Sequence, residues 1–209
     1  HANGNLARAR SVVADIVAAG GSAEAIAFDV ADGAATRGAL DALLEAGPVQ
    51  VVVNNAGVHD DAPMAGMSEA QWKRVIDVSL HGFFHVTQPL LLPMARKRWG
   101  RIVSVSSVAA VTGNRGQTNY AAAKAALHGA SKSLAREMAS RGITVNVVAP
   151  GVIEGQMAGD AFPPEMIKQT VPAGRAGRPE EVAALVAFLC SDAAGYINGQ
   201  VIGINGGMG

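Results

Sequence analysis

One tyrosine and one lysine stand at a spacing that could perform acid–base chemistry. Tyr120 and Lys124 are four positions apart, so on a helix their side chains share one face. The phenol of a free tyrosine has a pKa of about 10 and transfers protons poorly at neutral pH. A neighbouring ammonium stabilises the phenolate and lowers that pKa. We therefore predict that Tyr120 gives a proton to a carbonyl oxygen or takes one from an alcohol.

Such a pair is also common on solvated helix faces, so its surroundings decide. Ser107 lies just past a predicted strand and could donate a hydrogen bond to the same carbonyl. Asp29-Val30 closes another predicted strand, and the run 54–57 and Pro150-Gly151 each follow one. Since ligands of parallel α/β sheets bind beyond the carboxyl ends of the strands, we expect one crevice lined by these segments.

Two hydrophobic patterns alternate along the chain, short β-branched runs and longer stretches with helical spacing. This alternation predicts a single domain, residues 1–209, of the α/β class, with a doubly wound parallel sheet between two layers of helices. The strands are expected at residues 25–30, 49–53, 101–105, 143–149 and 201–204, and the helices at 5–19, 34–46, 69–97, 119–140 and 180–191.

The composition argues against several function classes. The 17 basic and 17 acidic residues cancel, so no basic field favours nucleic acid or an anionic membrane surface. No apolar run approaches the length of a membrane span. A single cysteine, Cys190, excludes an internal disulfide and favours a reducing compartment, so we expect a cytoplasmic protein.

Ser107, the pair Tyr120 and Lys124, the Asn-Asn-Ala-Gly run at 54–57 and Pro150-Gly151 together resemble the short-chain dehydrogenase/reductase family in order and spacing. The resemblance implies a Rossmann-type fold and hydride transfer between a nicotinamide cofactor and a carbonyl. By the same resemblance, Tyr120 is the general acid in reduction. Lys124 lowers its pKa and binds the nicotinamide ribose, and Ser107 polarises the carbonyl.

The resemblance also implies which residues contact the cofactor. An acid near the end of the family's second strand selects NAD, and residues 1–5 contain none, which favours NADP. The implied contacts are Asp29 and Val30 at the adenine, Asn54, Ala56 and Gly57 along the cofactor, Pro150, Gly151 and Ile153 by the nicotinamide, and Tyr120 and Lys124 themselves.

The sequence departs from the family in three places. The family's first strand and glycine-rich turn are missing before His1, so we expect the natural protein to have further N-terminal residues. Without them, we expect the strand at 25–30 to lack a neighbour, and residues 1–209 alone to fold poorly and bind a dinucleotide poorly. Ser79 replaces an asparagine that helps to hold a water in the family's proton relay, which puts that relay in doubt. Gly155, followed by Gln156, stands where many relatives carry a threonine that binds the cofactor.

Within the family, the stretches 113–117, 133–137, 140–146 and 196–200 are similar to bacterial β-ketoacyl-acyl-carrier-protein reductases. That similarity implies a homotetramer and a patch at Arg101 and Arg141 that binds the acidic carrier protein. The same arginines could simply be solvated helix ends. Two other functions stay open: an NAD(P)-dependent dehydrogenase of another ketone or alcohol, and a catalytically silent nucleotide-binding or interaction subunit.

Two histidine-containing segments are weaker candidates. His81 and His85 are spaced like metal ligands but lack an evident third ligand, so we predict no metal site. The run from His59 to Asp61 follows the 54–57 turn and is expected to be a solvated loop.

Overall fold

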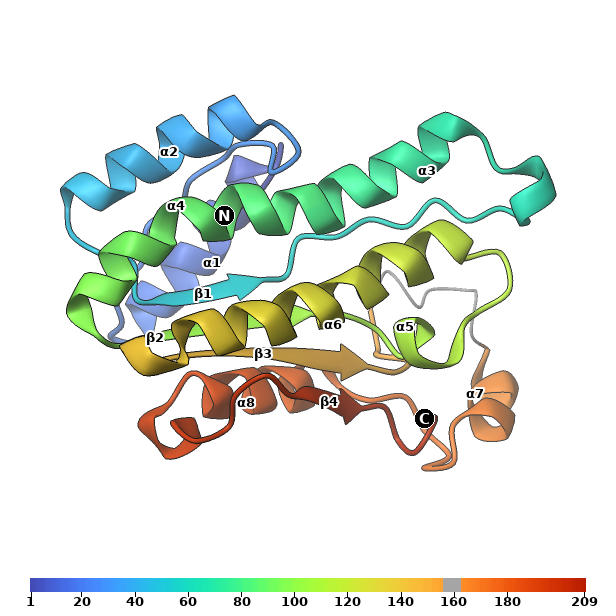
Figure 1. Ribbon diagram of the computed structural model, residues 1–209. Coiled ribbons are helices and arrows are strands. Elements are labelled where there is room, and N and C mark those ends of the chain that lie inside the picture. The colour runs from blue at the N-terminus through green and yellow to red at the C-terminus, as the bar shows by residue number, and fades with distance from the viewer. Residues whose placement is uncertain (156–162) are drawn as a thin grey trace.

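The computed structural model describes residues 1–155 and 163–209. Its centre is a parallel sheet in the order β1-β2-β3-β4, which confirms the predicted α/β class (Figure 1). The strands are β1 (Val51–Asn54), β2 (Gly100–Val105), β3 (Ile143–Pro150) and β4 (Val201–Ile204).

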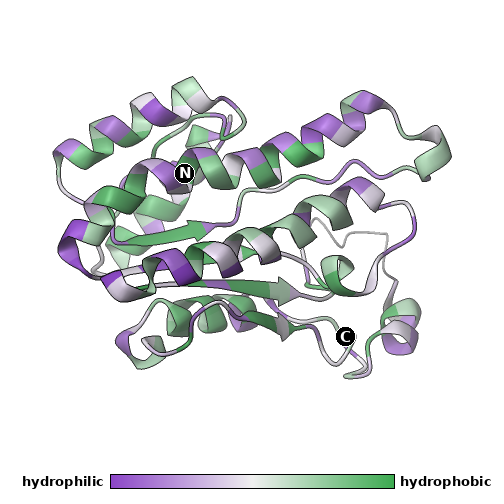
Figure 2. Ribbon diagram, in the orientation of Figure 1, coloured by the Kyte–Doolittle hydropathy of each residue, from purple (hydrophilic) through white to green (hydrophobic). Residues whose placement is uncertain are grey.

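Helices cover both faces of this sheet. On one face, α2 (Gly33–Glu45), α4 (Gly82–Lys97) and α6 (Thr118–Met138) enclose a core that includes Leu90 and Ile102. On the other face, α8 (Pro179–Leu189) packs Leu189 against Val103 of β2. Figure 2 shows strands that are hydrophobic along most of their length, whereas α2 alternates hydrophobic and hydrophilic residues. Burial of the apolar stripe of each helix on the sheet stabilises this three-layer arrangement.

The remaining helices connect or flank these layers. Polar side chains cap the start of two of them: Asn5 accepts from the backbone of α1, and Ser68 forms a capping box with Gln71 in α3. The sequence did not predict the short α5 and α7. The bounds are α1 (Leu6–Ala18), α3 (Glu69–Ile76), α5 (Ala109–Thr112) and α7 (Pro164–Thr170), with 3-10 turns at Met64–Gly66, Ala139–Arg141 and Asp192–Ala194.

The predicted strand at residues 25–30 is wrong. Its only strand-like contact within the described ranges is an isolated parallel bridge between Ala2 and Ala27. A strand needs a continuous ladder of backbone hydrogen bonds, and one bridge does not provide it. β1 is an edge strand of the sheet, and its Val51 and Val53 are 41 % and 43 % exposed.

The predicted helix at 69–97 is continuous but changes its winding. A π-helical turn, Asp77–His81, joins α3 to α4 and places Ser79 in the interior. Such π-bulges are rare and occur often at functional sites. Among the described residues, none of the helices combines the length and apolarity that crossing a membrane requires.

Candidate active site

A cavity of about 900 Å³ lies beyond the carboxyl ends of the strands, where the sequence predicted a crevice. Segments that are far apart in the sequence meet there, because parallel strands end at the same edge of the sheet. Five of the predicted site residues line it: Ser107, Tyr120, Pro150, Gly151 and Ile153.

Tyr120 is held as a phenol. Burial raises its pKa, the hydrogen bond with Ser107 opposes that shift, and the carboxylate of Asp61 adds to it. The net direction is upward because burial outweighs the rest, and the lowering that the resemblance assigns to Lys124 stays a prediction. Desolvation disfavours the phenolate more than the nearby groups favour it. Tyr120 therefore keeps its proton at neutral pH, which is the form that a general acid needs.

Lys124 is buried one helical turn further along α6, with 3 % of its surface exposed. Its Nζ donates to the carbonyl oxygen of Val105 at 2.8 Å and lies 5.7 Å from the centroid of the Tyr120 ring. Burial lowers the pKa of Lys124 to about 8, so the ammonium form still dominates at neutral pH. The residue thus places a positive charge beside Tyr120.

The glycine at position 57 keeps the space over this ammonium open. A Cβ there would lie 3.0 Å from the Nζ of Lys124. An ammonium has three N–H donors, and Val105 accepts from one of them. The open space and the other two N–H donors of the ammonium fit the hydroxyl groups of a nicotinamide ribose.

The predicted nicotinamide contacts lie at the end of β3. Gly151 donates its N–H to Ile204 at 3.1 Å, and a Cβ on Gly151 would lie 2.8 Å from the Cα of Asn205, so only glycine fits there. Ile153 lines both the large cavity and a smaller one of about 100 Å³. Gly155 has a φ of +135°, and its neighbour Gln156 lies outside the described residues.

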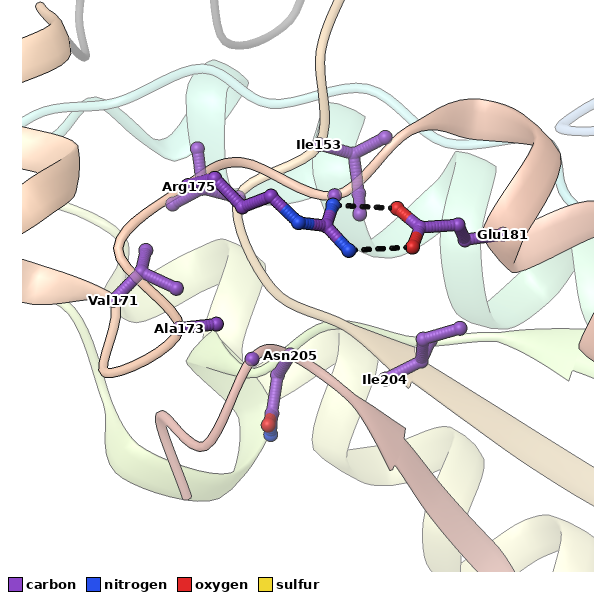
Figure 3. A pocket seen from close by; sticks show the side chains of 10 residues that line it. Ile153, Val171, Ala173, Arg175, Glu181, Ile204 and Asn205 are labelled. Carbon is purple, nitrogen blue, oxygen red and sulfur yellow. Dashed lines mark hydrogen bonds and ion pairs between the residues drawn. The ribbon is translucent and has the colours of Figure 1, made fainter.

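An ion pair closes one side of the smaller cavity (Figure 3). The guanidinium of Arg175 binds both carboxylate oxygens of Glu181, at 2.7 and 2.8 Å. Arg175 and the backbone of Arg178 hold the pKa of Glu181 at about 2. The pair therefore ties the segment that follows α7 to the first turn of α8, next to Ile153.

The other predicted cofactor residues do not line the large cavity. The carboxylate of Asp29 accepts from the N–H of Ala31 at 2.9 Å. Val30 is buried, and its carbonyl contacts the Nδ1 of His85 at 2.8 Å. The side-chain amide of Asn54 donates a hydrogen bond to the Oγ1 of Thr87 at 3.1 Å, and Ala56 is exposed.

Ser79 lies in the π-helical turn that packs against α6. Its side chain is buried, and its Oγ has no hydrogen-bond partner among the described residues. A buried hydroxyl without a partner is costly unless water satisfies it. The position therefore suits a water-holding role, although the hydroxyl is shorter than the amide that the family usually has there.

The structure contradicts the expected exposure of Arg101. Its side chain is 4 % exposed, donates to the carbonyls of Ser191 and Gly100, and stacks over Trp99 at 4.5 Å. These contacts use the guanidinium inside the fold, so it cannot reach a partner. Arg141 is exposed, at the amino-terminal end of β3, away from the cavity.

Other polar residues around the cavity escaped sequence analysis. Asp61, expected to be solvated, lines the cavity and accepts from Gln117 at 2.8 Å. Asn119 is fully buried beside Tyr120 and donates to the carbonyls of Asp60 and Gln71, at 3.0 and 3.2 Å. Its place directly before the tyrosine was the only available signal, because its partners lie far away in the sequence.

The histidines of the long helix are occupied elsewhere. His81 contacts Asp77 at 2.8 Å, and His85 contacts the Val30 carbonyl. Within the described parts of the chain, no three histidine, cysteine or acidic side chains cluster as metal ligands would.

Comparisons with known proteins show the family of the chain. The family described as enoyl-(acyl carrier protein) reductase matches residues 3–209. The 3-oxoacyl-[acyl-carrier-protein] reductase FabG of Salmonella typhimurium is 45% identical over 192 residues, which cover 90% of this chain and 79% of that protein. The FabG of Aquifex aeolicus is 51% identical over 164 residues, 77% of this chain and 65% of that protein. Nodulation protein G of Azospirillum brasilense is 44% identical over 199 residues, 90% of this chain and 80% of that protein. The chain belongs to the short-chain dehydrogenase/reductase family, whose members are nicotinamide-dependent oxidoreductases.

Proposed function

We propose that the protein reduces the keto group of a 3-oxoacyl thioester, carried by acyl-carrier protein, to the 3-hydroxyacyl form with NADPH. The observation that carries this proposal is the geometry: Tyr120 and Ser107 line the large cavity together, and the Lys124 ammonium lies 5.7 Å from the centroid of the Tyr120 ring. A phenol keeps its proton at neutral pH, and reduction of a ketone needs a proton donor at the carbonyl oxygen. The names of the relatives supply the substrate class.

In this mechanism the hydroxyl of Ser107 binds and orients the substrate carbonyl oxygen. Tyr120 gives that oxygen its proton, and the ammonium of Lys124 stabilises the phenolate that remains. Lys124, Gly57, Gly151 and Ile153 would hold the nicotinamide nucleotide, which supplies the hydride when it is bound.

Ser79 would complete the path by which Tyr120 regains its proton. Its buried, unpartnered Oγ lies on the turn that packs against α6, where a water could link it to Lys124. Under this proposal Ser79→Asn keeps or raises the turnover rate, and a large loss would assign the serine a role of its own.

A steady-state assay tests the reaction and the cofactor together. The protein is given a short 3-oxoacyl thioester with either NADPH or NADH, and cofactor oxidation is followed by absorbance. We expect a higher kcat/KM with NADPH. Faster turnover with NADH would overturn the cofactor choice, and no turnover of the thioester with either would overturn the substrate class.

For the carrier protein we retain Arg141 alone, since its side chain is exposed. Arg141→Glu should raise KM for a carrier-bound substrate and leave KM for a small free ketoester unchanged, because only the former brings acidic groups to this surface. Equal effects on both substrates would remove Arg141 from the docking surface. A tetramer and a cytoplasmic location remain predictions, which gel filtration and cell fractionation can check.

A further inference from the structure

A buried serine joins the strand that leads to Ser107 to the helix that carries Tyr120 and Lys124. The Oγ of Ser106 donates to the backbone carbonyl of Lys124 at 3.0 Å and lies 2.8 Å from the Nε2 of His128. Ser106 is buried, and its N–H continues the pairing of β2 with β3. Neither Ser106 nor His128 has a role in the mechanism described above.

The proton count of this cluster assigns its hydrogen bonds. A serine hydroxyl has one proton, and that proton goes to the carbonyl of Lys124. Ser106 Oγ must therefore accept the hydrogen bond from His128, whose Nε2 carries a proton. The imidazole thus directs the serine hydroxyl toward α6.

The same strand end makes a second contact with Lys124. The residue before Ser106, Val105, accepts from the Lys124 ammonium at 2.8 Å. The residue after it is Ser107. Two consecutive residues of one strand end thus hold both the backbone and the side chain of Lys124, one turn after Tyr120.

We infer that His128 is a positioning residue for the reduction. It acts through Ser106, which binds the backbone of α6. This contact fixes the position of Tyr120 and Lys124 relative to Ser107 at the strand end. This inference rests on the proposed function, because the proton transfer from Tyr120 is the step whose geometry it sets. Small displacements of reacting groups lower rates steeply while leaving substrate binding little changed.

The test compares variants that differ only in this hydrogen bond. His128→Leu and Ser106→Ala remove it, and His128→Gln offers an amide N–H in place of the imidazole. Gly129→Ala is the matched control, since it changes the adjacent exposed residue of α6 and a Cβ there meets nothing within 4 Å. The first readout is kcat and KM with NADPH and a short 3-oxoacyl thioester.

We expect His128→Leu and Ser106→Ala each to lower kcat about tenfold and to leave KM within about twofold. The double variant should lose no more than either single variant, because both break one linkage. His128→Gln should recover most of kcat, and Gly129→Ala should match the parent.

A second readout needs no substrate. The chain has 2 tyrosines, and Tyr196 is fully exposed, so in a Tyr196→Phe background the ultraviolet titration of phenolate reports Tyr120 alone. Loosening α6 admits water to the phenol, so His128→Leu should move this titration toward the ordinary tyrosine pKa, and His128→Gln should return it.

The two readouts separate the inference from the proposed function. If the parent protein reduces the thioester but His128→Leu changes neither kcat nor the phenolate titration, the positioning role is overturned. If His128→Gln is as impaired as His128→Leu and equally less stable, the role is structural only, and the inference fails. If the parent does not reduce the thioester, the proposed function fails, and the phenolate titration still decides whether His128 positions Tyr120.

Discussion

Burial of the Lys124 ammonium makes a quantitative prediction about stability and pH. In the unfolded chain the lysine has its ordinary pKa of 10.5, and in the fold its pKa is about 8. Between these values the unfolded chain binds the proton more strongly than the fold does, so the free energy of unfolding rises with pH. Below about pH 8 both states are protonated, and this contribution to the slope vanishes.

The size of the effect follows from the shift. Each pH unit within the window is worth about 1.4 kcal/mol. Raising the pH from about 7 to about 9.5 crosses roughly 1.5 units of the window, so Lys124 should add about 2 kcal/mol to the free energy of unfolding. Lys124→Met has no proton to lose and should lack this increase.

The assay is urea unfolding followed by circular dichroism at a series of pH values, for the parent and for Lys124→Met. The difference between the two curves isolates Lys124. Cys190, whose pKa burial raises, acts in the opposite direction in both proteins and cancels. Both proteins also carry Tyr120→Phe, because loss of the neighbouring ammonium would shift the phenol as well. Lys132→Met, an exposed lysine on the same helix, should follow the parent. Parallel curves for the parent and Lys124→Met would refute the reasoning, since the ammonium would then cost nothing to bury.

Three further predictions concern single side chains. Tyr120→Phe should lower kcat with a thioester by about 10²–10⁴-fold without changing the melting temperature, because it removes only the proton donor; residual activity near the parent level would exclude Tyr120 as the acid. Arg101→Met should lower the free energy of unfolding by about 2 kcal/mol in urea titrations, because it leaves buried carbonyl oxygens without a donor; an unchanged value would mean that solvent replaces the guanidinium. Gly82→Ala should lower the free energy of unfolding by about 1–3 kcal/mol, since its Cβ would lie 2.9 Å from a methyl of Val30. Gly129→Ala is the control, because its Cβ would enter open space, and it should not destabilise the protein. Similar melting temperatures for the two variants would show that α4 can shift.

Local patterns in the sequence were sufficient for much of the fold. Alternating β-branched runs and helical spacing predicted four of the strands and the long helices, because burial of apolar side chains against a sheet imposes those periods. The segment at 25–30 has the composition of a strand but forms only one bridge. Pairing is a property of neighbours, which composition does not report.

For the active site, too, the sequence determined some features and the tertiary structure determined others. The types and spacing of Ser107, Tyr120 and Lys124 determined, without coordinates, which chemistry the chain could perform, since strand ends and helix turns place such residues at one edge of a parallel sheet. The tertiary structure decided the direction in which the pKa of Tyr120 shifts, because burial and the carboxylate of Asp61 outweigh the hydrogen bond with Ser107. It also decided that Arg101 is internal and that His128 reaches Ser106. Desolvation and hydrogen bonding depend on atoms brought together from distant parts of the chain, and no local pattern in the sequence contains them.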